Sequence, residues 1–136
     1  MKSAQSLKNF IAKNLDGFTE SNVIIGSVDL SRFPQKNLCV IVPETMEVVE
    51  QYIDGSFEAK TSFTLSFLFR GEKYPALVEK MEAKADEIQK LIMNSLSLEN
   101  AVTSAELEKI EFYYDCGTAE KQATGLDVKM TITEEK

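Results

Sequence analysis

The sequence predicts an α+β domain in which two helices pack on one face of an antiparallel, or at most mixed, sheet in the order α-β-β-α-β-β. Two observations carry this prediction. Several segments alternate apolar and polar residues, which is typical of strands with one wet face. Two other segments repeat apolar residues every three or four positions, as amphipathic helices do. The helices would cover the apolar side of the sheet and give a two-layer structure.

The chain length fits one domain, expected to span residues 1–136. A chain of this size buries about two-thirds of the surface that it exposes when unfolded. Hydrophobic residues make up 43% of the chain and charged residues 27%, which are proportions typical of a folded globular protein. Wholesale disorder is therefore not expected.

The first helix is predicted over residues 3–15. Ser3 or Ser6 can accept a hydrogen bond from a free backbone N–H at its start. Asp16 and Gly17 end the helix, because glycine tolerates the left-handed backbone found after helices. The apolar positions that share one helical face are Leu7, Phe10, Ile11 and Leu15.

Strands and loops alternate between residues 23 and 53. In order, they are a short β-prone run at 23–28 interrupted by Gly26, a loop at 31–36 containing Pro34, an apolar strand at 38–42, and a β-rich segment at 46–53. Pro43 is expected to stop the strand that precedes it, because proline cannot donate to a sheet ladder. Asp54 and Gly55 form a turn signal that predicts a long hairpin with the next strand.

The strongest strand pattern covers residues 57–69. Its apolar positions fall on one face of the strand and are Phe57, Ala59, Phe63, Leu65, Phe67 and Phe69. Its polar positions fall on the other face and are Glu58, Lys60, Ser62, Thr64 and Ser66. The apolar stripe is expected to be core rather than the lining of a ligand cavity.

The second helix is predicted over residues 75–94, where Pro75 suits the first turn. Its apolar stripe consists of Leu77, Val78, Met81, Ala85, Ile88, Leu91 and Ile92. Two alternating strands, at 110–116 and 126–133, close the fold. The link 117–125 is polar and expected to be mobile.

The net charge of −7, from 22 acidic and 15 basic residues, disfavours sequence-specific nucleic-acid binding. No stretch approaches the length of about 20 apolar residues that crosses a bilayer, so we expect no membrane association. The N-terminus lacks the apolar core of a signal peptide, and a cytoplasmic origin is expected.

Histidine is absent, so neither Ser–His–Asp nor Cys–His chemistry is available. The two cysteines, Cys39 and Cys116, are far apart in the sequence and are expected to be small buried thiols rather than a metal or redox pair. No glycine-rich phosphate-binding motif occurs. We therefore expect no catalytic, cofactor-binding or metal site.

Acidic residues cluster in two places, and a carboxylate-dependent enzyme is the least favoured hypothesis. One cluster comprises Glu44, Glu47, Glu50, Asp54 and Glu58, and the other comprises Glu108, Glu111 and Asp115. Paired carboxylates do chemistry when they are buried and perturbed. A solvated acidic face is the favoured interpretation of both.

Four residues are candidates for an interface: Leu68, Glu111, Tyr113 and Asp115. Tyr113 lies on the polar face of its strand beside Glu111 and Asp115, and Leu68 interrupts the polar face of the longest strand. Apolar residues on the outer face of a sheet can mark a partner interface. A second small core under a loop is the alternative interpretation.

The whole-chain pattern over residues 3–133 resembles the minor capsid and tail-terminator proteins of tailed bacteriophages and prophages. The likeness rests on the short first helix and on the segments LCVIVPE, FEAKTSFTLSFLF, YPALVEKMEAKADEIQKLI and GLDVKMTITEEK. Members of this family are small, lack catalytic machinery and share the element order given above.

The resemblance implies a ring, commonly a hexamer, at the head-proximal end of a tail tube. Its partners would be other copies of the chain, the tail-tube protein and a head-completion protein. The chain would start in the bacterial cytoplasm and end at the head–tail junction of a virion. No functional residue carries over, because the family has no motif to match. The alternative hypothesis is a small intracellular binding module that docks a protein or an apolar ligand on its sheet.

Overall fold

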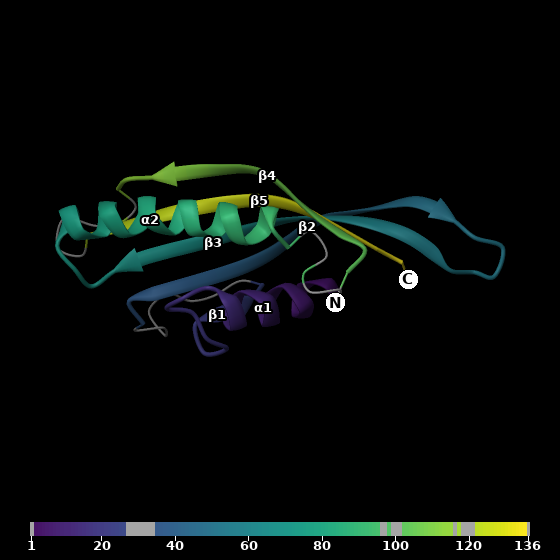
Figure 1. Cartoon of the computed structure of the whole chain (residues 1–136), viewed down its shortest axis with the longest axis horizontal. Helices are drawn as coiled ribbons and strands as arrows, with labels where there is room; N and C mark the ends of the chain where they lie inside the picture. The colour runs from purple at the N-terminus through teal and green to yellow at the C-terminus, as the bar shows by residue number, and fades with distance from the viewer. Residues whose placement is uncertain are drawn as a thin grey trace.

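A computed structural model describes residues 2–26, 35–95, 98, 102–115, 117 and 122–135. The elements are α1 (Lys2–Asn14), β1 (Val23–Ile25), β2 (Asn37–Gln51), β3 (Phe57–Arg70), α2 (Tyr74–Met93), β4 (Ser104–Tyr113) and β5 (Ala123–Glu135). Five strands form one sheet in the order β1-β2-β3-β5-β4 (Figure 1). The predicted α+β class is confirmed.

The sheet is mixed, because β1 runs parallel to β2 while all other neighbours are antiparallel. Three strands, not two, precede α2, since β1 is a separate three-residue strand. Gly26 follows this strand, and its φ of 95° suits a residue without a side chain. The end of the predicted run at 23–28 and most of the predicted loop at 31–36 lie outside the described residues.

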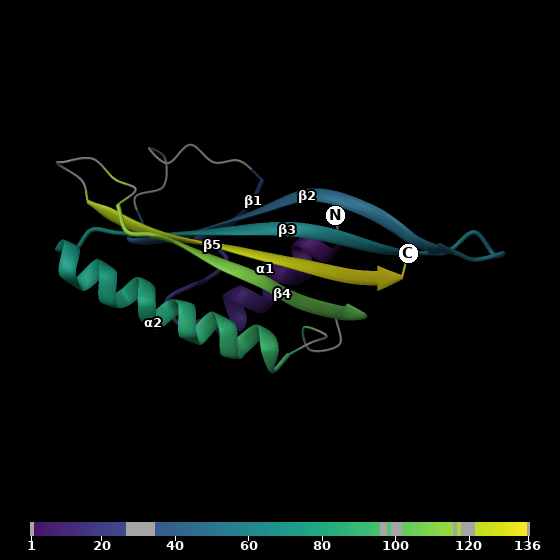
Figure 2. The same ribbon diagram turned by 90° about the horizontal axis from the view of Figure 1, so that it is seen from above.

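Both helices lie on the same side of the sheet, and none of the described residues forms a helix on the opposite side (Figure 2). α1 packs under β1 and β2, and α2 packs under β3, β4 and β5. We call the uncovered side the open face. The core between the layers is apolar; its most enclosed large side chains include Leu7, Ile11, Phe63, Leu65, Met81, Ile88 and Ile92. Burial of this apolar area is the main force holding the layers together.

The predicted alternation of β3 is confirmed. Phe63, Leu65, Phe67 and Phe69 are buried against the helices, and Ser62 and Ser66 point to the open face. The ring of Phe67 meets that of Phe18 edge to face, with 5.4 Å between the ring centroids. The predicted boundaries of both helices agree with the structure to within one residue, and Gly17 follows α1 with a φ of 86°.

Pro43 does not end a strand, and this prediction was wrong. β2 is continuous from Asn37 to Gln51. The Cys39 N–H donates to the Asn22 carbonyl oxygen (2.9 Å), so the N–H groups of alternate residues 39, 41 and 43 point away from β3. β1 pairs with β2 only as far as Ile41, so no described strand lies beside Pro43 on this side of β2. The N–H that proline lacks would face this open edge, and no hydrogen bond of the sheet is lost.

β4 begins at Ser104, six residues before the predicted start, and β5 begins at Ala123 inside the predicted link. The start of β4 lacks a clear period of two because a bulge falls between Leu107 and Lys109. Cys116 and residues 118–121 of the link lie outside the described residues.

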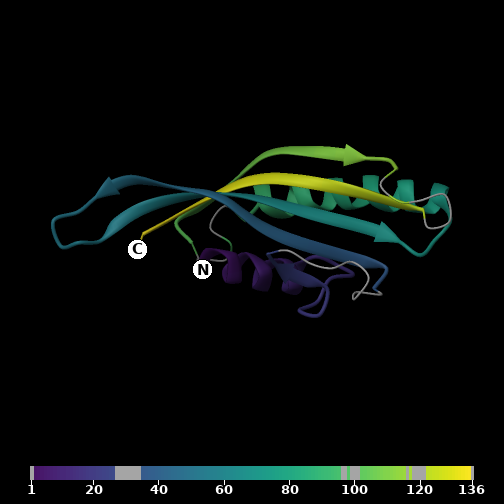
Figure 3. The same cartoon turned by 180° about the vertical axis from the view of Figure 1, so that it is seen from behind.

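The hairpin of β2 and β3 projects beyond β4 and beyond both helices (Figures 1 and 3). We call residues 44–58 the arm. The lengths of the elements explain the projection. β3 has 14 residues and extends over about 45 Å, whereas the 20 residues of α2 cover about 30 Å. The helical layer is therefore too short to cover the whole hairpin.

Candidate interaction surfaces

The open face brings together two of the predicted interface residues, Leu68 and Tyr113. Both are paired in register with Gly125 on β5, from its two sides, and Leu38 is paired with Leu68. Glycine has no side chain, so the row Leu38–Leu68–Gly125–Tyr113 has a gap in its middle. A hollow of about 440 Å³ lies over this gap and is also lined by Val40 and Asp127. We call it the open-face hollow.

The next row of paired residues is Val40–Ser66–Asp127–Glu111, and its members on β3, β5 and β4 are polar. Ser66 donates a hydrogen bond from Oγ to Asp127 Oδ1 (2.8 Å), and Asp127 lies opposite Glu111. Like charges facing each other across two strands are unfavourable. Lys109 Nζ lies 3.5 Å from Glu111 Oε1 and offsets part of this repulsion. Negative charge therefore gathers on the β5–β4 side of the hollow.

These carboxylates shift the pKa of Tyr113. The charge of Asp127, followed by that of Glu111, raises the pKa of the Tyr113 hydroxyl above its ordinary value of 10.0. The side chain remains 42% exposed. Tyr113 is thus partly accessible to solvent, and its hydroxyl is neutral at physiological pH. Tyrosine side chains of this kind are enriched at protein interfaces.

Three of the four predicted interface residues lie on the open face, and the fourth does not. Asp115 follows the end of β4, is exposed, and does not line the hollow. Sequence reasoning missed Leu38, Gly125 and Asp127 as members of this surface. The polar position of Asp127 was visible in the alternation of β5. Its place beside Glu111 depends on the register between strands, which has no local signal.

Two glutamates sit at β-bulges on the strands that border the central pair, and they reach inward over the open face. Glu44 lies at the bulge after Pro43 and accepts a hydrogen bond from the Thr64 hydroxyl. Glu108 lies at the bulge of β4 and accepts one from the Thr131 hydroxyl. The Thr64 bond and, secondarily, Lys129 lower the pKa of Glu44. Inward-pointing charges at strand edges discourage unspecific strand pairing.

The arm is rich in exposed apolar residues and in acids. Its exposed apolar side chains are Met46, Val48, Val49, Tyr52 and Ile53, and Ile53 is fully exposed. Its acids are Glu44, Glu47, Glu50, Asp54 and Glu58, and the segment 44–58 contains no lysine or arginine. Partial burial and then the charges of Glu50, Glu58 and Glu135 raise the pKa of Tyr52. The arm therefore has a negative local field.

The tip of the arm is held in one conformation. The Tyr52 N–H donates to the Ser56 carbonyl oxygen (2.9 Å), and Gly55 occupies a positive φ of 90°. Ser56 donates from its hydroxyl and its N–H to Asp54 Oδ1, at 2.6 and 3.0 Å, which lowers the pKa of Asp54. A tip ordered in this way loses little conformational entropy on binding.

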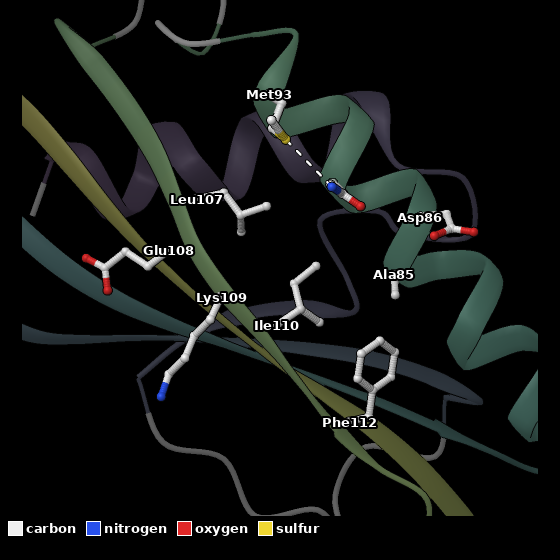
Figure 4. Close-up of a pocket in the computed structure, with 9 residues that line it drawn as sticks. Ala85, Asp86, Met93, Leu107, Glu108, Lys109, Ile110 and Phe112 are labelled. Carbon is white, nitrogen blue, oxygen red and sulfur yellow. Dashed lines mark hydrogen bonds between the residues drawn. The ribbon is translucent and has the colours of Figure 1, made fainter.

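A second hollow, of about 400 Å³, lies along the seam between α2 and β4 (Figure 4). Leu107, Ile110 and Phe112 point from β4 toward α2, whereas Glu108 and Lys109 point to the other side of the strand. Met93 closes one end and accepts a weak hydrogen bond at Sδ from Gln89 Nε2 (3.8 Å). This seam is open to solvent and is the edge of the core.

The end of the sheet opposite the arm is basic. Lys36, Arg70 and Lys73 gather where β2 begins and β3 ends. Arg70 Nε donates to the Gln35 carbonyl oxygen (2.9 Å), and the Lys36 side chain lies over Gly71. Glu72 is the one acid in this turn, and it is paired with Lys80 at 3.6 Å. Arg70 follows Leu68 by two residues, so this basic end borders the open-face hollow.

Within the described part of the chain, no three His, Cys, Asp or Glu side chains are placed to share a metal ion. Cys39 is buried and unpaired as a thiol, and burial raises its pKa, so it is inert at neutral pH.

Neither helix in the described ranges has the length and apolar content needed to cross a bilayer. No protein-family model matches the chain, and no curated protein sequence matches it.

Proposed function

We propose that the chain is a phage or prophage structural protein of the tail-terminator or minor-capsid type. It would assemble as a ring, with a hexamer as the expected size, at the junction between head and tail. Its partners would be other copies of itself, a tail-tube protein and a head-completion protein. It would be made in the bacterial cytoplasm and then incorporated into the virion.

The observation that carries this proposal is the arm. A projecting hairpin with five exposed large hydrophobic residues is costly to leave in water unless it binds something. Residues on the arm contribute little to the core, which lies between the helices and the sheet. Their apolar character is explained by contacts with another molecule.

Open strand edges support the same proposal. Among the residues that the structure describes, no strand pairs with the outer edge of β4, or with the outer edge of β2 beyond Ile41. Free N–H and C=O groups on such edges can pair with a neighbouring molecule where no bulge or inward-pointing glutamate interrupts the edge. The net charge of −7 also suits a ring through which DNA passes, because like charges limit adhesion of the phosphate backbone.

The test is assembly. The purified chain is sized by multi-angle light scattering, alone and with a tail-tube protein from the same genome, if that genome encodes one. We expect a closed ring of several copies, or rings seen by electron microscopy on the ends of tubes whose growth has stopped. Tube protein alone is the control and should polymerise to unlimited lengths. A chain that stays monomeric in both samples and leaves tube length unchanged would contradict the proposal.

The open-face hollow favours one alternative, a non-enzymatic binding module that docks a protein or apolar ligand on its sheet. Leu38, Val40, Leu68 and Tyr113 give the hollow an apolar lining, and its volume is in the range of small-ligand sites. This alternative predicts a monomer in solution and chemical-shift changes at Tyr113 on titration with an apolar probe such as 8-anilinonaphthalene-1-sulfonate.

A further inference from the structure

We propose that the arm of one copy docks over the open-face hollow and basic end of the next copy, in a head-to-tail contact. This inference rests on the proposed self-assembly and specifies which two surfaces make it. The occupant of the hollow is therefore residues 44–58 of a second copy of this chain.

The first argument is charge complementarity. Residues 44–58 carry five acids and no base, of which Glu44 is paired with Lys129 (3.6 Å) and Glu47 lies opposite Lys60 on β3, so the net charge of the arm remains negative. Among the described residues, the turn at the opposite end of the sheet holds Lys36, Arg70 and Lys73 with Glu72, which Lys80 neutralises, while Asp115 lies past the end of β4. The chain as a whole is acidic, so this basic end is a local exception. Complementary charges of this kind steer encounter and fix the register of a contact.

The second argument is apolar complementarity. The arm presents Met46, Val48 and Ile53 to solvent, and the hollow presents Val40, Leu68 and Tyr113. Asp127 and Glu111 on the β5–β4 side of the hollow repel acids, whereas Arg70 lies toward the β2–β3 side. The acids of the arm are thereby directed to the basic side, with the apolar residues over the hollow.

The geometry makes the contact intermolecular. The two surfaces lie along the same strands, since Val40 on β2 lines the hollow and Glu44 on β2 begins the arm. On β3, Ser66 at the hollow follows Glu58 in the arm by eight residues, or about 26 Å of extended strand, and a continuous strand does not fold back on itself. An arm cannot reach its own hollow. Two different surfaces at opposite ends of a molecule give a heterologous contact, which closes into a ring or grows into a filament.

Arm-to-arm pairing is the competing contact, and its charges oppose it. In an antiparallel pairing of two β2 edges, Glu44, Glu47 and Glu50 of one copy would face the same residues of the other. Like charges placed opposite each other in a sheet are destabilising. The bulge at Val49 also breaks the regular edge that strand pairing requires.

The experiment uses two double charge reversals. Glu47→Lys with Glu50→Lys changes the arm, and Lys36→Glu with Lys73→Glu changes the basic end. All four substituted residues are exposed, so we expect both variants to fold. The control, Glu79→Lys with Glu82→Lys, makes the same charge change on exposed positions of α2. Circular dichroism checks the fold, and light scattering at low ionic strength measures the assembly.

Each reversal alone should weaken assembly by about tenfold or more, because repulsion replaces attraction at every contact. An equimolar mixture of the two should restore it, since each reversed arm then meets a reversed basic end. The α2 control should assemble like the wild type. If both reversal variants assemble as strongly as the wild type, this docking arrangement is wrong and the self-assembly proposal still holds. A wild-type chain that never assembles, alone or on tail tubes, would overturn both.

Discussion

At the scale of single residues, Tyr113 shows how apolar surface and negative charge meet on the open face. It stands at the edge of a hollow, with Asp127 and Glu111 close enough to raise its pKa above 10.0. The repulsion acts on the ionised phenolate, so the fold favours the neutral hydroxyl. A neutral, partly exposed tyrosine can donate a hydrogen bond and pack its ring against a partner at once.

The first prediction concerns the titration of Tyr113. Its contribution to stability is present below pH 10.0 and is lost as the pH rises through the raised pKa, because the folded state binds this proton more tightly than the unfolded state. The wild type should therefore lose stability in alkali more steeply than Tyr113→Phe. Urea unfolding followed across the alkaline range measures this difference.

Asp127→Asn provides the matched control for that titration. It removes the largest cause of the shift, so the pKa of Tyr113, followed by its ring NMR signals, should fall toward the ordinary value. A pKa that Asp127→Asn leaves unchanged would show that the two groups do not interact in solution.

At the scale of elements, the contact between α2 and β5 fixes the helix over the sheet. Thr124 at the start of β5 is fully buried and donates its hydroxyl to the Leu77 carbonyl oxygen in the first turn of α2 (3.0 Å). The residue that caps α2, Lys73, makes no side-chain hydrogen bond to that turn. The threonine hydroxyl is therefore the polar link that ties this end of the helix to the sheet.

The second prediction tests this link. Thr124→Val keeps the shape of the side chain and removes the hydroxyl, and we expect a loss of about 1 kcal/mol in the free energy of unfolding. Thr133→Val is the matched control on the same strand, because Thr133 is half-buried on the open face. Its effect should stay within about 0.5 kcal/mol. Equal losses at both positions would mean that the buried hydrogen bond adds nothing.

At the scale of the whole molecule, two groups of hydrophobic residues have different roles, apart from those on the open face and along the seam between α2 and β4. One group is buried between the helices and the sheet and holds the fold together. The other lies on the arm, where exposure leaves its apolar area available for a partner. Ile88 on α2 and Ile53 at the tip of the arm represent the two groups, since one is fully buried and the other fully exposed.

The third prediction follows from this division. Ile88→Ala should lower the free energy of unfolding by about 2–5 kcal/mol, because it leaves a cavity in the core. Ile53→Ala should change it by no more than about 0.5 kcal/mol and should act on assembly instead. Denaturant unfolding and light scattering on the same samples separate the two effects. An Ile53→Ala variant that is as unstable as Ile88→Ala would refute the division.

Local patterns in the sequence predicted the helices, the face that each buries and the hairpin with its turn at Asp54 and Gly55. These features depend on neighbouring residues, and their periods of two and 3.6 are legible along the chain. The sequence also singled out Leu68 and Tyr113 as unusual on a polar face. Pro43 was misjudged because the effect of a proline depends on whether its strand has a neighbour on that side.

The way in which these elements meet depends on contacts between distant segments, which appear only in the folded chain. Leu68 and Tyr113 lie 45 positions apart in the sequence and flank Gly125 because the registers of β3, β5 and β4 place them there. The arm likewise extends past the helices because its strands are longer than the helices packed on them. Register and relative length are properties of pairs of segments, and no single segment encodes either one.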